Sequence, residues 1–69
     1  MIEVFKTNII KRENAEGLIQ KLSSDFPETR INFDLEDCDK ILRIEGTQVH
    51  PEKVKDIVNN AGFVCEILD

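Results

Sequence analysis

The stretch HPEKVKDIVNNAGF, residues 50–63, predicts a helix whose two ends are both marked in the sequence. Pro51 suits the first helical position, because its φ is already near the helical value and no N–H is needed there. Glu52 follows it and complements the positive end of the helix dipole. Gly62 stands where a glycine commonly ends a helix. The apolar residues between these ends recur every three or four positions and form one stripe: Val54, Ile57, Val58 and Ala61.

The residues just before this helix support the prediction of its first turn. With His50 as the N-cap, Val49 and Val54 stand at the spacing of a hydrophobic staple, in which two apolar side chains pack across the start of a helix. The helix should therefore begin at Pro51.

Alternating apolar residues predict strands on both sides of this helix. Residues 42–46 alternate ahead of it, and residues 31–35 alternate before those, with the acidic segment 36–39 as a short hairpin connection. Residues 63–68 alternate after the helix. Because a period of two puts successive side chains on opposite faces of a sheet, we expect a hairpin, the helix and then a final strand.

The first part of the chain has the same strand-then-helix pattern. Residues 3–9 alternate as a strand does. A helix should begin near Asn14, a favourable cap residue, and end at residues 23–24, ahead of the proline that breaks the pattern. Gly17 weakens this helix by about 1 kcal/mol relative to alanine. Its apolar stripe consists of Ala15, Leu18, Ile19 and Leu22.

The order of elements is therefore βαββαβ, the ferredoxin-like arrangement of the α+β class. Right-handed crossovers place both helices on one face of a four-stranded antiparallel sheet with strand order 2-3-1-4. The 69 residues leave room for a single domain, residues 1–69, with one modest core. The expected core residues are Phe5, Ile9, Leu18, Ile19, Leu22, Ile31, Phe33, Leu35, Leu42, Ile44, Val54, Ile57, Val58 and Ile67.

Composition argues against several classes of function. Nine basic and fourteen acidic side chains give a net charge of −5, whereas binding to nucleic acid or to a membrane surface depends on an excess of Lys and Arg. No apolar run approaches the roughly 20 residues that cross a bilayer, and no export signal precedes the first strand, so we expect a cytoplasmic protein. The sequence has no Ser/His/Asp or Cys/His arrangement and no Gly-rich phosphate loop, so we do not expect an enzyme.

Four stretches go beyond the general topology: INFDL at 31–35, LRIEG at 42–46, HPEKV at 50–54 and AGF at 61–63. In order and spacing they resemble the progression V-x-V-D-L, V-x-V-E-G, D-P-E-x-V and A-G-Y of heavy-metal-associated domains. That family contains copper chaperones and the amino-terminal modules of metal-pumping ATPases. The resemblance covers nearly the whole chain, and it implies a ferredoxin-like fold and a relation to metal ion transport.

The resemblance also identifies what this chain lacks. The family holds a soft ion such as Cu(I) with M-x-C-x-x-C, between the first strand and the first helix. The register set by Leu18 and Leu22 places Ile9 at the methionine, Lys11 at the first cysteine and Asn14 at the second. A charged ammonium cannot ligate a cation, and an amide oxygen suits a soft metal poorly. We therefore expect no metal in this loop, and no other cofactor.

Two interpretations of the vacated loop stay open. In the first, Lys11 supplies the positive charge that the metal would have given, and a docking surface is preserved with Arg12 and Phe63 as further contact residues. In the second, the charges of Lys11 and Arg12 are simply solvated, as exposed lysines usually are.

The remaining ligand-type residues also have two interpretations each. Cys38 lies in the acidic hairpin, where a thiol and neighbouring carboxylates suit weak metal binding, although a solvated turn is the simpler expectation. His50 is either a ligand or a surface cap. Cys65 is expected to be a small buried hydrophobe, and the two cysteines are expected to be free thiols.

Two classes of function follow. The first is a non-catalytic protein-interaction or regulatory module that contacts an unknown protein partner, or a second copy, through the open face of the sheet. The apolar residues expected on that face are Ile2, Val4, Ile41, Val64 and Leu68. The second is a metal-binding or metal-transport protein that uses Cys38, His50 or the acidic hairpin.

Overall fold

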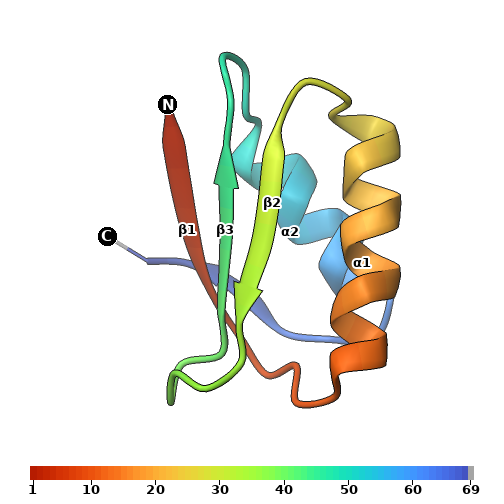
Figure 1. The fold of residues 1–69 in the computed structure, drawn as a ribbon, viewed down its shortest axis with the longest axis vertical. Helices are drawn as coiled ribbons and strands as arrows, with labels where there is room; N and C mark the ends of the chain where they lie inside the picture. The colour runs from red at the N-terminus through yellow and green to blue at the C-terminus, as the bar shows by residue number, and fades with distance from the viewer. Residues whose placement is uncertain (69) are drawn as a thin grey trace.

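The computed structural model describes residues 1–68 and confirms the predicted α+β, ferredoxin-like arrangement. Four strands form one antiparallel sheet in the order β2-β3-β1-β4, and both helices lie on the same side of it (Figure 1). The elements are β1 (Ile2–Thr7), α1 (Arg12–Asp25), β2 (Arg30–Asp34), β3 (Ile41–Glu45), α2 (Pro51–Asn60) and β4 (Cys65–Ile67). Within the described residues, neither helix has the length and apolar character needed to cross a bilayer.

Helix α2 begins and ends where the sequence predicts. His50 is its N-cap and Pro51 its first residue. Val49 and Val54 are both buried, as a hydrophobic staple requires. Gly62 has a φ of +98°, a conformation that glycine adopts without a steric penalty.

Helix α1 begins earlier than the sequence indicates. Lys11 is its N-cap, and the Lys11 carbonyl oxygen accepts the backbone N–H groups of Asn14 and Ala15 at 3.1 and 3.2 Å. Asn14 therefore lies inside the first turn, and the prediction that the helix begins near it is wrong. Because no side chain caps this end, the sequence carries no cap signal at the true start.

Strand β4 is shorter than predicted, because its first two expected residues bond elsewhere. The N–H of Phe63 donates to the carbonyl oxygen of Val58 at 3.2 Å, which keeps Phe63 with the end of α2. The N–H of Val64 donates to the side-chain oxygen of Asn8 at 2.9 Å. Pairing with β1 therefore begins only at Cys65, opposite Thr7.

The core lies between the sheet and the helices and contains most of the predicted residues. Ile19, Ile31 and Leu35 are half-buried against it, and Ile67 is the one predicted core residue that is exposed, at 37%. Ile67 lies opposite Phe5 on an edge strand, so no further strand covers its outer side. Four further buried residues belong to the core: Ala15 of the predicted helix stripe, Val49 of the predicted staple, Cys65, which was predicted to be a small buried hydrophobe, and Phe26, which was not predicted to be buried.

Candidate functional site

Three loops meet at one end of the sheet, and this end contains the positions that the family resemblance singles out. They are the loops 8–11, 35–40 and 61–64 (Figure 1). The backbone N–H of Thr7 donates to the carbonyl oxygen of Asp39 at 3.1 Å, and the Thr7 hydroxyl donates to that of Lys40 at 2.5 Å. The bond between Val64 and Asn8 joins the third loop to the first. Hydrogen bonds thus tie all three loops into one surface.

The positions that the resemblance aligns with the family's two cysteines lie at the start of α1. Lys11 is exposed at the N-cap, and Asn14 is half-buried three residues later. Ile9, at the position of the family's methionine, is fully buried in the core. An ammonium, an amide and a buried alkyl side chain offer no thiolate, so these residues do not fit a soft metal ion.

The start of α1 is instead a basic and partly apolar projection, here called the basic tip (Ile10, Lys11 and Arg12). All three side chains are exposed, and Ile10 is the most exposed large hydrophobic residue of the described chain, at 74%. The positive charges of Lys11 and Arg12 lie at the positive end of the α1 dipole, where cations are unfavourable. The one ion pair within residues 1–68 joins Lys6 to Asp39 at 3.9 Å, so neither charge of the tip is paired there. No motif in the sequence marks Ile10 as exposed.

The hairpin at the same end gathers three ligand-type side chains. Each of Asp37, Cys38 and Asp39 offers one ligand atom, and these atoms lie within 4.8 Å of one another. However, Asp37 Oδ1 already accepts the backbone N–H of Asp39 at 2.8 Å, and Asp39 forms the ion pair with Lys6. The carboxylates therefore have structural roles within the turn.

The structure does not bring His50 to this hairpin. Cys38 precedes β3 and His50 follows it, so the two lie at opposite ends of a five-residue strand. Such a strand is about 16 Å long, which is too far for one ion to bridge. Any metal site at either residue would have to form without the other.

The two cysteines are both free thiols, and they differ in environment. Cys38 is exposed, whereas Cys65 is buried, which confirms its interpretation as a small hydrophobe. Burial raises the pKa of the Cys65 thiol to about 11, although the Lys55 ammonium opposes the shift. Cys65 is therefore protonated at neutral pH and is neither a nucleophile nor a ready metal ligand.

The open face of the sheet is divided into a polar and an apolar half. The β2 and β3 half is mostly polar, with Arg30 opposite Glu45 and Asn32 opposite Arg43, and the other half also contains one charged pair, Lys6 on β1 opposite Glu66 on β4. The apolar side chains of this face follow β1 and β4 and are here called the apolar strip (Ile2, Val4, Val64 and Leu68). Val4 is half-buried and the other three members are exposed.

Ile41 does not belong to the exposed part of this face, contrary to the prediction. It points to the open side, but only 6% of it is exposed. In the sheet it lies between Asp34 on β2 and Lys6 on β1, and the Lys6 side chain reaches to Asp39 in the adjacent hairpin. Long neighbouring side chains can cover an apolar residue in this way, so the predicted surface is smaller on β3.

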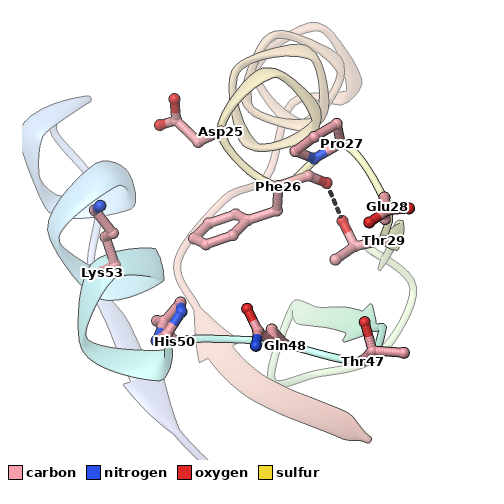
Figure 2. A pocket seen from close by; sticks show the side chains of 9 residues that line it. All are labelled: Asp25, Phe26, Pro27, Glu28, Thr29, Thr47, Gln48, His50 and Lys53. Carbon is pink, nitrogen blue, oxygen red and sulfur yellow. Dashed lines mark hydrogen bonds between the residues drawn. The ribbon is translucent and has the colours of Figure 1, made fainter.

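A pocket lies near the other end of β3, between the end of α1 and the start of α2 (Figure 2). Its volume is about 630 Å³. It is lined by Asp25, Phe26, Pro27, Glu28, Thr29, Thr47, Gln48, His50 and Lys53. Phe26 forms its inner wall, and the ring centroids of Phe26 and His50 lie 6.4 Å apart. Of the predicted site residues only His50 is here, and no motif in the sequence indicates the pocket, because its walls come from two separate loops.

Comparisons of this chain with protein-family models, curated proteins and solved structures found no match. The assignment to the ferredoxin-like fold therefore rests on the element order and the strand order of the chain itself.

Proposed function

We propose that this chain is a domain of the heavy-metal-associated type that has lost its thiolate site and acts as a non-catalytic protein-interaction module. The basic tip is the observation that carries this proposal. It occupies the loop that would hold the metal in the family, and it presents two cations and an exposed isoleucine.

The charges of the tip favour an external partner because they are unfavourable within the chain. A cation in the first turn of an exposed helix typically costs about 0.3–1 kcal/mol relative to a neutral residue. No acidic side chain within residues 1–68 forms an ion pair with Lys11 or Arg12. Glu13 in the same turn complements the dipole but forms no ion pair with either cation, so both charges of the tip stay available to an acidic partner.

The chemistry of the tip defines the partner that it would fit. Lys11 and Arg12 would face acidic groups, and Ile10 would enter a small apolar depression between them. Val64 is the member of the apolar strip nearest to the tip, since its N–H is bonded to Asn8 in the loop that contains the tip, and the Lys6–Glu66 pair separates it from Val4 and Leu68. A second copy is the other candidate occupant of the strip, but a net charge of −5 on each copy opposes self-association.

Charge reversal at the tip tests the proposal. Lys11→Glu combined with Arg12→Glu should abolish partner capture from a lysate at low salt, while Lys21→Glu, which reverses a single charge at an exposed position later in α1, should not. The tip variant should also unfold at a higher urea concentration than the wild type, because its new acidic residues suit the α1 dipole. A lysate protein retained equally by all three forms, or none retained by the wild type, would refute the proposal. Light scattering of the wild type tests the second copy.

The relation to the heavy-metal-associated family has a separate test. Lys11→Cys combined with Asn14→Cys restores the family's ligand spacing, so this variant should bind Cu(I) with a stoichiometry of one. Failure to bind would count against the register that relates these positions to the family's cysteines.

Metal binding through other ligands is a second candidate function, favoured by the closeness of Asp37, Cys38 and Asp39. Elemental analysis of protein purified without a chelator distinguishes it from the first. A bound metal that is lost in the Cys38→Ser variant would support the second function, and a metal-free protein would exclude it.

A further inference from the structure

The pocket of Figure 2 lies between two helix ends of opposite polarity. The carboxyl end of α1 forms one wall and the amino end of α2 forms the other. Helix dipoles make the first wall negative and the second positive. No basic residue in the last turn of α1 offsets its negative end, whereas Glu52 in the first turn of α2 offsets part of the positive end, at which no side chain caps the backbone.

The charged side chains of the pocket follow the same division. Asp25 and Glu28 belong to the α1 wall, and Lys53 belongs to the α2 wall. Opposite charges on facing walls often neutralise one another directly. Here they do not, because the one ion pair within residues 1–68 lies elsewhere, between Lys6 and Asp39.

The polar side chains of the second wall are also free to form hydrogen bonds with a ligand. Among the described residues, the side chains of Thr47, Gln48 and His50 make no hydrogen bond to the rest of the chain, although all three line the pocket. Phe26, which is only 7% exposed, provides an apolar surface behind them. The pocket thus combines one apolar wall with separated negative and positive groups.

The walls are held in place by short-range contacts, so the pocket exists before any ligand arrives. The Thr29 hydroxyl donates to the carbonyl oxygen of Phe26 at 2.6 Å, and the N–H of Phe26 donates to that of Leu22 at 2.7 Å. The loop after β3 approaches so closely that a Cβ at Gly46 would lie 2.7 Å from the Thr29 methyl group. Ligand pockets are typically about 300–1,000 Å³ and mostly apolar; this pocket has such a volume but a mostly polar lining, which suits a charged ligand.

We propose that this pocket binds a small zwitterion of the α-amino-acid class. The ammonium group of the ligand faces Asp25 and Glu28, its carboxylate faces the Lys53 ammonium, and its side chain packs on Phe26. A ligand with a single charge would satisfy only one wall, so recognition requires both charges on one small molecule. This site is independent of the basic tip, which lies at the other end of the sheet.

Titration of the intact chain with L-phenylalanine, followed by the backbone amide signals in NMR spectra, tests the proposal. Saturable shifts are expected at Thr29, Gln48 and Lys53, with no shift at Lys11. N-acetyl-L-phenylalanine lacks the ammonium charge and L-phenylalaninamide lacks the carboxylate charge. Each should bind at least about threefold more weakly, as expected for the loss of one partly exposed charge pair.

Matched variants locate the two charges. Lys53→Met should weaken binding of L-phenylalanine by about three- to tenfold, and Lys21→Met should leave it unchanged. Asp25→Asn should weaken it similarly, with Asp56→Asn as the control on α2. All four residues are exposed, so none of the substitutions should disturb folding. The absence of saturable shifts up to the solubility limit, or binding of either singly charged analogue as tightly as L-phenylalanine, would overturn the proposal.

Discussion

The adjacent residues Ile9 and Ile10 provide the sharpest test of the structure, because they are chemically identical and differ completely in burial. Ile9 is fully buried and Ile10 is 74% exposed. Replacing Ile9 by alanine removes three buried carbon atoms, each contributing about 0.8 kcal/mol. With the cavity that remains, we expect Ile9→Ala to lower the free energy of unfolding by about 3 kcal/mol. Ile10→Ala should change it by less than about 0.5 kcal/mol.

The measurement is urea unfolding of the two variants and the wild type, followed by circular dichroism at equal protein concentration. A loss of 3 kcal/mol in a domain of this size lowers Tm by about 12–24 °C, so thermal unfolding provides a second readout. Equal losses in the two variants would contradict the difference in burial, and a greater loss in Ile10→Ala would show that the loop between β1 and α1 is shifted by one residue. That result would also remove Ile10 from the basic tip.

The two glycines Gly62 and Gly17, and the two cysteines Cys65 and Cys38, are each expected to respond in opposite ways. Gly62→Ala should destabilise the protein by about 1–2 kcal/mol, because the φ of Gly62 is +98°. Gly17→Ala should stabilise it by about 0.5–1 kcal/mol, because Gly17 lies inside α1 with open space around it. Urea unfolding measures both changes. Burial raises the pKa of Cys65 from 9.0 to about 11, so at high pH the unfolded state releases this proton before the folded state does. The free energy of unfolding should therefore be unaffected by this group below pH 9 and should decrease as the pH rises towards 11. The Cys65→Ala variant should not show this decrease. A thiol reagent should modify Cys38 in the native protein and Cys65 only after unfolding, and rapid native modification of both would contradict the burial of Cys65.

Periodicity predicted the elements of this fold well because each strand and helix carries its own pattern. The start of α2 is the best example, since Pro51 and the Val49–Val54 staple are local signals that hold in any tertiary context. The start of α1 was misplaced for the converse reason. Lys11 caps it through backbone hydrogen bonds alone, so the type of residue at this position does not indicate the start of the helix.

The candidate sites were harder to predict from the sequence than the fold was. Lys11 and Arg12 were recognised through the family resemblance, but the exposure of Ile10 beside them was not. The pocket was missed because Phe26 and His50 are far apart in the chain and approach only when the end of α1 meets the start of α2.

The sequence by itself determined the βαββαβ order, the direction in which most side chains face and the absence of thiolates at Lys11 and Asn14. These properties depend on residue type and on spacing within single elements. Only the tertiary structure decided that Ile41 is covered while Ile67 is exposed, and that Ile9 is buried while Ile10 is not. The physical reason is that the alternation of apolar and polar residues indicates which face of a sheet a residue occupies. Burial at edges and loops depends instead on which neighbouring segments pack there.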